Sequence, residues 1–524
     1  MSLSKKVGIA SIIMMLSALF SRVAGLVREI SIAHIGGADA AVDAYQIAFM
    51  LPEVLNHVLA SGFLSITFIP IFSYYLENNR EADGWKVFNN IHNIFSLLLI
   101  ILILIAEVFT PQIIKILSPG TKDPETIKKA ITMTRIILPA QLFFFSGGLF
   151  MAVQYAKEKF FIPALAPVIY NLGIICFGLL LSNICGMEGF SWGVLAGSLI
   201  GNFIIQLYGA KKAGFKFSMQ LNLKDSELIR YFKVSMPLMV GISMFFSTEL
   251  FFKFFGSYLD QGSISKLNYA MRVMLILVSL FGQAVGVASY PYLAKLAVEK
   301  NIKKMNELIN GTVKYLGVVI PFSVLFMILR KEIIFVLFQR GEFKSSATMI
   351  TSEILLYLMI GTFAFAAQTV VVRGYYAVQN TLLPALLGTI SAFLSLPIYY
   401  IFMKKMGVNG VALAVSVSAI IQVLLLYLIW NKKTSNKDAL KVIYFYGKII
   451  VVSVMIGVGL SYFKSYFLIN IDTNSFAGCV FNGIIISALF ITLLICSSNL
   501  LGIKEVNEVI YKIFSKFIKK KQNE

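Results

Sequence analysis

The chain has 524 residues, of which 58% are hydrophobic and 14% are charged, and its formal net charge is +20. Its mean hydropathy of +0.80 lies far above the range of soluble globular domains. Most apolar runs reach the roughly 20 residues that about 30 Å of hydrocarbon requires, whereas barrel strands would be short and alternating. The composition therefore excludes a soluble enzyme and predicts an all-α polytopic membrane protein.

The apolar runs predict about fourteen transmembrane helices. In chain order these cover residues 7–34, 42–76, 85–117, 127–156, 160–182, 189–210, 227–258, 263–297, 305–329, 346–378, 382–403, 408–430, 441–463 and 475–500. Several exceed about 25 residues, so we expect them to tilt, kink or extend into water. Candidate kinks lie at Pro52, Pro139, Pro237 and Pro321.

The lysines and arginines gather in alternate loops, which predicts the orientation of the chain because positively charged loops stay in the cytoplasm. They cluster near residues 5–6, 157–159, 211–216, 300–304, 432–437 and 519–521. Both termini are therefore expected in the cytoplasm. Residues 330–344 form a mixed-charge exception among the outer loops. Topology and contact with anionic membrane lipids account for the net charge without a nucleic-acid partner.

Cysteine and histidine give no sign of a metal or cofactor site. The cysteines are scattered through or near apolar helices and behave as small hydrophobic residues, and the histidines form no cluster. These residues are Cys176, Cys185, Cys479, Cys496, His34, His57 and His92. We therefore expect no metal, no cofactor and no catalytic residue.

An internal repeat indicates a duplicated transporter. The segment YAKEKFFIPALAP, which starts at Tyr155, aligns with YAVQNTLLPALLG, which starts at Tyr376. Pro70 and Pro291 have the same separation in the chain as these two tyrosines. The repeat predicts two six-helix lobes in the same orientation, a pseudo-twofold axis along the membrane normal and a central cavity between the lobes.

The predicted domains follow from this repeat and from the character of the tail. Residues 1–222 form an N-terminal lobe and residues 223–433 a C-terminal lobe, followed by two further helices in 434–501. Residues 502–524 combine apolar residues at helical spacing with many lysines, which predicts an amphipathic basic helix on the cytoplasmic face.

Two arginines interrupt the first apolar run, SALFSRVAGLVREI. Arg22 lies about 14 residues before Gly36, or roughly 21 Å along a helix, which places it near the middle of the bilayer. A lipid-facing arginine there would cost at least about 2.5 kcal/mol, so we expect Arg22 to face the cavity. Ser21, Gly25 and Arg28 share one helix face, whose small residues allow a helix or a ligand to approach closely.

Arg272 is likewise an arginine within an apolar segment, the eighth predicted span. A guanidinium binds phosphate or carboxylate through two parallel hydrogen bonds and remains protonated in a low dielectric. Arg22, Arg28 and Arg272 therefore predict a substrate that carries phosphate, most naturally a diphosphate. Glu249 and Lys253, spaced i,i+4 in the seventh span, are expected to pair with each other.

The segments SRVAGLVRE and DAYQIAFMLPEVLNHVLASGFLSITFIPIFSYY resemble the signature of the MurJ (MviN) family. Members of that family are lipid II flippases of the multidrug/oligosaccharidyl-lipid/polysaccharide exporter superfamily, and the likeness covers nearly the whole chain. It implies fourteen spans, with a groove for the lipid tail bordered by the last two helices. Family roles carry over to five residues: Ser21, Arg22, Arg28, Asp43 and Arg272.

The chain also departs from the family pattern. Family members commonly have arginine on helix two where this chain has Asn56 and His57, and glutamate where it has Ser61. Aspartate often precedes the arginine of helix eight, where Met271 stands, and Glu53 is an unexpected charge. Asn56, His57 and Ser61 are therefore candidate substrate-binding residues, and they bear on which lipid-linked sugar is moved.

The resemblance implies alternating access. The head group of an undecaprenyl-diphosphate-linked peptidoglycan precursor, lipid II, would enter the cavity from the cytoplasm, while its tail stayed in the lipid. Rocking of the two lobes would then expose the head group outside. The resemblance further implies that the membrane potential or a coupling cation resets the cycle.

Three other functions compete with this one. A flippase for another lipid-linked oligosaccharide or polysaccharide repeat unit would share the architecture and could use the same arginines. A multidrug cation antiporter would need carboxylates in the cavity, where the deep ionisable residues are mainly basic. A membrane enzyme such as a glycosyltransferase would need an acidic metal-binding pair or a nucleophile with its base, and the sequence offers neither.

Overall fold

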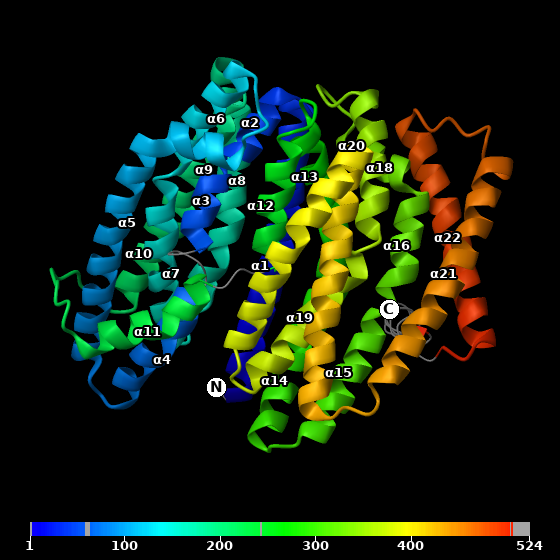
Figure 1. The fold of residues 1–524 in the computed structure, drawn as a ribbon. Helices are drawn as coiled ribbons and strands as arrows, with labels where there is room; N and C mark the ends of the chain where they lie inside the picture. The colour runs from blue at the N-terminus through cyan, green and yellow to red at the C-terminus, as the bar shows by residue number, and fades with distance from the viewer. Residues whose placement is uncertain (1–2, 58–62, 241–243, 504, 507–524) are drawn as a thin grey trace, which may run out of the picture. The chain divides into compact units, whose positions relative to one another are not determined.

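A computed structural model describes residues 3–57, 63–240, 244–503 and 505–506 (Figure 1). These residues form α-helices interrupted by short π-helical segments, and no strand occurs among them. The all-α prediction is confirmed. Residues 507–524, which hold most of the predicted basic tail, lie outside the described part of the chain.

The chain divides into two compact units. Unit 1 comprises Met1–Gly241, Glu249–Ser265 and Arg340–Phe343, and unit 2 comprises Ile242–Thr248, Lys266–Gln339 and Lys344–Glu524. Helix α12 (Met244–Gly256) therefore contributes to both units. The lobe boundaries expected at 222/223 and 433/434 remain predictions.

The other helices of unit 1 are α1 (Leu3–Gly36), α2 (Ala40–Ala48), α3 (Met50–Leu55), α4 (Phe63–Glu77), α5 (Glu81–Leu117), α6 (Pro124–Ile137), α7 (Ala140–Ala156), α8 (Phe161–Cys185), α9 (Glu188–Ser198), α10 (Ile205–Lys212) and α11 (Ser226–Val240). A π-helical segment, Leu199–Ile204, joins α9 to α10. The predicted span 42–76 is thus divided among α2, α3 and α4, and Phe49 separates α2 from α3.

The start of α13 (Ser263–Leu277), up to Ser265, belongs to unit 1, and the rest of α13 belongs to unit 2. The other helices of unit 2 are α14 (Ala284–Val298), α15 (Ile302–Leu316), α16 (Val319–Ile328), α17 (Arg330–Phe338), α18 (Ser345–Met359), α19 (Thr362–Ala377), α20 (Leu382–Thr434), α21 (Ala439–Phe467) and α22 (Phe476–Leu500). Part of the mixed-charge segment 330–344 forms α17 instead of a loop. Helix α20 contains two predicted spans, which meet at the non-helical residue Gly407.

Many helices meet the requirements of a membrane span. Among the described residues, nine continuous helical stretches are long and apolar enough to cross a membrane, or ten if α18 and α19, bent by 44°, count as one. In α5 the buried residues Ile91, Phe95, Leu99 and Ile103 recur every four positions. The remaining faces of this helix expose leucine, isoleucine, valine and phenylalanine side chains. A helix that is apolar all round fits a lipid environment on its exposed faces.

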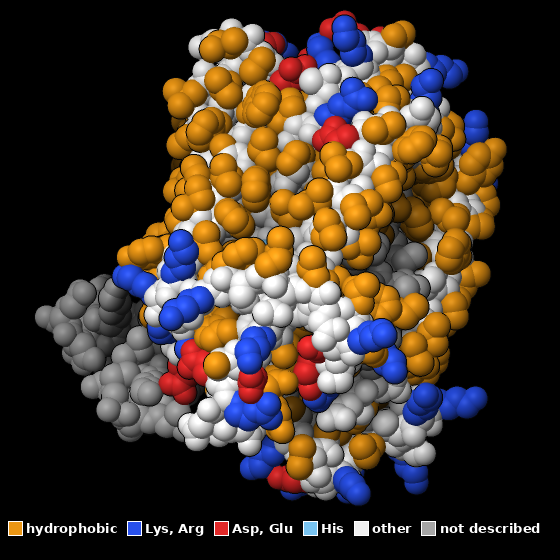
Figure 2. All heavy atoms as spheres, turned by 90° about the vertical axis from the view of Figure 1, so that its left-hand side faces the viewer, with side chains coloured by type: hydrophobic (Ala, Val, Ile, Leu, Met, Phe, Trp, Pro, Cys, Tyr) orange, Lys and Arg blue, Asp and Glu red, His pale blue; other side chains and the backbone are white. Residues whose placement is uncertain are grey.

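The charged residues are separated from the apolar surface. On the face shown in Figure 2, hydrophobic side chains form a broad band, and basic and acidic side chains gather above and below it. This distribution is expected for a protein whose middle contacts hydrocarbon, where a charge would have to be desolvated. The surface therefore agrees with the polytopic membrane prediction.

The duplication is visible in the backbone. Non-glycine residues with positive φ end α4 and α7 at Asn79 and Glu158, and their counterparts in the repeat, Lys300 and Gln379, end α14 and α19. The hydrogen bonds repeat as well: Lys159 N donates to Gln154 O at 2.8 Å, and Asn380 N donates to Tyr375 O at 3.0 Å. These helices share one type of C-terminal cap. The predicted repeat is thus confirmed at the level of individual turns.

Gly186 and Gly407 form a third matched pair. Their φ and ψ angles are 56° and −133° for Gly186, and 59° and −132° for Gly407. This region of backbone conformation is nearly restricted to glycine. An added Cβ would meet no atom within 4 Å at either position, so a substitution would act through the backbone alone.

We predict that Gly186→Ala and Gly407→Ala each destabilise the protein by about 1–3 kcal/mol, the usual cost of such backbone strain. Gly447→Ala in α21 is the matched control, because Gly447 has equally open surroundings without a positive φ. Alanine should leave stability unchanged there or raise it slightly. Thermal unfolding of the purified protein measures the three effects, and equal melting temperatures for all three variants would contradict the prediction.

Candidate functional site

Arg28 of α1 is held by two side chains within unit 1. Its Nη2 donates to Glu29 Oε1 at 2.7 Å, and its Nη1 donates to Asn171 Oδ1 of α8 at 3.0 Å. The Arg28 side chain is 20% exposed, whereas that of Glu29 is only 4% exposed. Because a buried carboxylate needs a charged or hydrogen-bonded partner, Glu29 fixes the direction of the guanidinium.

The predicted face of Ser21, Gly25 and Arg28 packs on α8. Asn171 Nδ2 donates to the backbone carbonyls of Ser21 at 3.4 Å and Pro167 at 2.8 Å. A Cβ added at Gly25 would lie 3.9 Å from Asn171 Oδ1. Helix α8 is therefore the element that approaches the small residues of α1, and Asn171 lies beside all three positions of this face.

The other two arginines lie in different surroundings. The Arg22 side chain is exposed on α1. Arg272 lies in α13 and is half-buried within unit 2. Arg22 and Arg28 thus belong to one unit and Arg272 to the other. A joint site formed by these three arginines remains a prediction.

Asp43 of α2 caps the start of α13. Its carboxylate accepts hydrogen bonds from the backbone N–H groups of Gly262 and Ser265, each at 2.7 Å, and from the Ser265 hydroxyl. Asp43 is buried, with 6% of its surface exposed. The free N–H groups and the dipole at the N-terminus of a helix favour an anion at this position. The contacts give Asp43 a structural role, and the functional role implied by the family remains a prediction.

An ion pair that the sequence did not predict joins α3 to α12. Lys253 Nζ contacts both carboxylate oxygens of Glu53, at 2.8 and 3.0 Å. The Lys253 side chain is 2% exposed and that of Glu53 is 29% exposed. The expected pairing of Lys253 with Glu249 is therefore wrong, because a carboxylate from a helix far away in the sequence lies against the ammonium. Removal of Glu53 would leave a buried ammonium without its counter-charge.

Asn56 and His57 lie next to this pair, in a short π-helical stretch after α3. Asn56 Nδ2 donates to Gln141 Oε1 of α7 at 3.2 Å, and His57 is half-buried. Ser61, the third candidate on helix two, lies outside the described residues. Asn56 thus presents an uncharged polar group where the family commonly has arginine.

Glu29, Asn171 and Lys253 are polar residues of this region that sequence reasoning did not place in a site. A signal for Glu29 was available, because it follows Arg28 directly inside an apolar helix. Together the contacts give two cations, Arg28 and Lys253, each opposite a carboxylate. Such pairs keep positive charge inside a membrane protein while limiting its desolvation cost. An incoming anion could bind either cation only by competing with its carboxylate.

We predict that Glu53→Gln destabilises the protein more than Lys253→Met, because it leaves the more deeply buried partner uncompensated, at a cost of about 3–5 kcal/mol. The double variant Glu53→Gln/Lys253→Met should recover part of the loss. Thermal unfolding of the four proteins forms a double-mutant cycle. Additive losses would show that the two charges do not interact.

Known proteins resemble the chain over most of its length. A family model described as "Lipid II flippase MurJ" matches residues 32–482. The chain is 30% identical over 435 residues to "Lipid II flippase MurJ" of Thermosipho africanus, covering 83% of this chain and 87% of the relative. It is 28% identical over 439 residues to "Probable lipid II flippase MurJ" of Vibrio cholerae, covering 81% and 83%.

The fold is similar to solved transporter structures. The structure titled "Lipid II flippase MurJ, inward closed conformation" aligns with a TM-score of 0.75 at 27% identity, over 96% of this chain and 99% of the other. An inward-facing multidrug resistance MATE family transporter of the MOP superfamily aligns with a TM-score of 0.65 at 15% identity, over 79% and 94%. The second likeness concerns the fold alone.

Proposed function

The chain belongs to the MurJ family of lipid II flippases, and from this premise we propose that it carries lipid II from the cytoplasmic to the outer leaflet by alternating access. The observation that carries the proposal is the arrangement of Arg28, which the short contacts to Glu29 and Asn171 orient on α1. A guanidinium has five N–H donors in a rigid fork, so a phosphate that replaces the Glu29 carboxylate meets donors that are already oriented. Arg28 is therefore oriented for an anionic group before the substrate arrives.

Phosphate binding at Arg28 is an exchange of partners. A diphosphate brings more charge and more acceptor atoms than the Glu29 carboxylate, and the fork of a guanidinium matches both. Because Glu29 remains beside Arg28, the site is never left as an isolated buried cation after the substrate leaves. This exchange limits how tightly the head group is held, which favours release on the other side of the membrane.

Arg22 and Arg272 are proposed as the other arginines that bind the substrate. Ser21 and Gly25 would let the head group approach α1, while Asp43 would hold the start of α13. Asn56 and His57 would bind the sugar and peptide portion, which needs hydrogen bonds more than charge, and Ser61 remains a predicted substrate-binding residue. The proposal thus assigns the diphosphate to the arginines and the rest of the head group to helix two.

The remaining parts of the proposal concern the whole molecule. The lobes would comprise residues 1–222 and 223–433, and residues 434–501 would border a groove for the lipid tail. The protein would lie in the bacterial inner membrane with both termini in the cytoplasm, and the basic tail of residues 502–524 would contact anionic lipids. A coupling cation or the membrane potential would reset the transport cycle. Flipping makes and breaks no chemical bond, so the protein would act as a transporter and not as an enzyme.

We predict that Arg22→Ala, Arg28→Ala and Arg272→Ala each fail to sustain growth of a bacterial strain depleted of its own lipid II flippase, although the variants still insert into the membrane. Lysine at these positions should rescue poorly, because it lacks the planar fork. Arg230→Ala is the control, since its side chain is 63% exposed on α11. Normal growth of all three alanine variants, at normal protein levels, would refute the phosphate site.

Asn56→Arg separates lipid II from other lipid-linked glycans. If lipid II is the substrate, the three arginines hold its diphosphate without help from position 56, and an added arginine there should be tolerated or should strengthen binding mildly. If helix two is shaped to a different head group, the new guanidinium would be desolvated without a partner, at a cost of several kcal/mol. Complementation of the flippase-depleted strain by wild type and Asn56→Arg, side by side, makes the comparison. Failure of a well-expressed wild type would favour a flippase for another lipid-linked oligosaccharide.

A further inference from the structure

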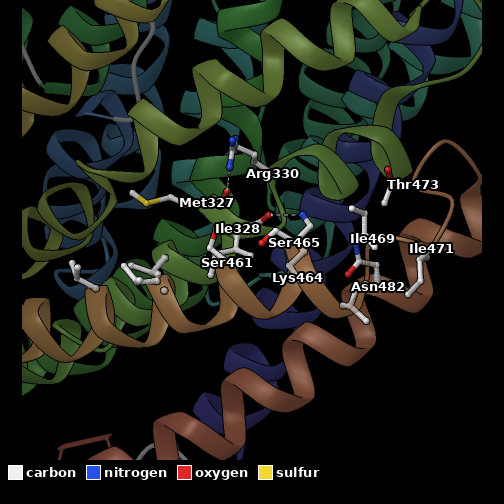
Figure 3. A pocket seen from close by; sticks show the side chains of 15 residues that line it. Met327, Ile328, Arg330, Ser461, Lys464, Ser465, Ile469, Ile471, Thr473 and Asn482 are labelled. Atoms are coloured by element: carbon white, nitrogen blue, oxygen red, sulfur yellow. Dashed lines mark hydrogen bonds between the residues drawn. The ribbon is translucent and has the colours of Figure 1, made fainter.

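A pocket of about 700 Å³ lies within unit 2, between α16, the start of α17 and the last turns of α21 (Figure 3). Its apolar wall includes Val324 and Met327 of α16 and Val458 of α21. At one end the lining becomes polar, with Arg330, Lys464 and Asn482.

The polar end contains a closed network of charges. Lys464 Nζ contacts Glu332 Oε1 at 2.7 Å and Oε2 at 2.9 Å, and it donates to the carbonyl of Ile328 at 2.9 Å. Asn482 Nδ2 donates to Glu332 Oε1 at 2.9 Å. The Glu332 side chain is only 4% exposed, so this network neutralises a buried carboxylate. It ties α17 to α21 and α22, and it adds no net charge to the pocket.

Arg330 supplies the charge that remains. Its Nη1 donates to the carbonyl of Met327 at 2.8 Å, and the side chain is half-buried. Within the described part of the chain this is its one recorded hydrogen bond, which leaves several N–H donors of the guanidinium at the pocket. The polar end therefore favours an anion.

Asn482 indicates a second chemical group that an occupant of the pocket should carry. Its side chain is fully buried at the wall of the pocket, and no group among the described residues donates a hydrogen bond to its Oδ1 atom. An amide oxygen left without a donor in such a position is destabilising, because it has lost its hydrogen bond to water without a replacement. The pocket therefore offers an acceptor to a hydroxyl or ammonium group as well as a cation to an anion.

The wall of the pocket is continuous with the surface that faces lipid. Val454 and Val458, on the α21 side, are 52% and 66% exposed, as expected for side chains that contact acyl chains. An occupant that enters from the bilayer must therefore combine an apolar chain, an anionic group and a hydrogen-bond donor. Basic pockets between transmembrane helices bind lipid head groups through the same combination.

We propose that this pocket binds a phospholipid with an anionic, hydroxyl-bearing head group of the phosphatidylglycerol type. Its phosphodiester accepts hydrogen bonds from Arg330, a head-group hydroxyl donates to Asn482 Oδ1, and an acyl chain follows the wall of Val324 and Val458. This lipid is an accessory to the transporter and not its cargo. The inference goes beyond the proposed function, because it holds whatever glycolipid the chain transports.

Native mass spectrometry can measure how tightly short-chain phosphatidylglycerol binds to the delipidated full-length protein. Phosphatidylcholine is the comparison lipid. Phosphatidylcholine has a phosphate but no head-group hydrogen-bond donor. We expect phosphatidylglycerol to bind about tenfold more tightly, because its head-group hydroxyl can donate to Asn482 Oδ1, whereas phosphatidylcholine leaves this buried acceptor without a donor.

Two variants locate the binding. Arg330→Gln should weaken the binding of both lipids, because both have a phosphodiester, whereas Lys405→Gln, an exposed lysine outside the pocket lining, should not. Ser461→Trp should fill the pocket and block binding, whereas Met455→Trp, on the exposed part of α21 but outside the lining, should not. Melting temperatures within a few degrees of wild type show that a variant is folded.

Equal binding of the two lipids, or equal effects of each variant and its control, would overturn the proposal and identify the bound molecules as general membrane lipid. Lipid II is absent from this experiment, so its outcome is independent of the transport assignment. A protein that fails to complement the flippase-depleted strain but binds phosphatidylglycerol through Arg330 would retain this site and lose the proposed cargo.

Discussion

A charged side chain inside an apolar helix needs a partner of opposite charge, and this constraint accounts for three ion pairs of the molecule. Arg28 is opposite Glu29, Lys253 is opposite Glu53, and Glu332 is opposite Lys464. In each pair one side chain is 4% exposed or less, so removal of its partner would leave a costly buried charge. Two of the pairs join helices that are distant in sequence, and the proposed function assigns the cation of the Arg28 pair to an anionic head group.

The charge pairs do not follow the internal duplication of the chain. The two halves share the turns at Asn79 and Lys300, at Glu158 and Gln379, and at Gly186 and Gly407. The ion pair of Glu53 and Lys253 does not follow this repeat, because the residues at the same separation are the apolar Met274 and Ile32. Arg28 likewise corresponds to an acidic residue, Glu249. The repeat therefore supplies the framework, while the charged side chains that depart from it supply chemical asymmetry.

Much of the fold was predictable, because composition and apolar run length are properties of single segments. The repeat was also readable, since Pro-Ala-Leu after Tyr155 and after Tyr376 marks the same helix start in both halves. The shared face of Ser21, Gly25 and Arg28 follows from helical spacing alone, but its partner Asn171 could not be identified without the packing of α8 on α1. Local periodicity contains no information about which helix lies opposite.

Other features depend on contacts between distant segments, and the spacing of residues in the sequence does not show which of these contacts form. An ion pair between Glu249 and Lys253 is reasonable for an isolated helix, yet Lys253 pairs with Glu53 because tertiary packing brings α3 against α12. The family resemblance points to Asp43, and its contacts with Gly262 and Ser265 reveal that it caps a helix far along the chain. The charges of segment 330–344 suggest a loop, whereas α17 forms there around the buried Glu332.

The most direct measurement of the central claim is the binding of lipid II and of undecaprenyl monophosphate to wild type and to Arg28→Ala, by native mass spectrometry of the purified protein. If a diphosphate is held by Arg28, wild type will bind lipid II more tightly than the monophosphate, and Arg28→Ala will lose most of that difference. Equal binding of lipid II by wild type and Arg28→Ala, with both proteins folded, would contradict the account.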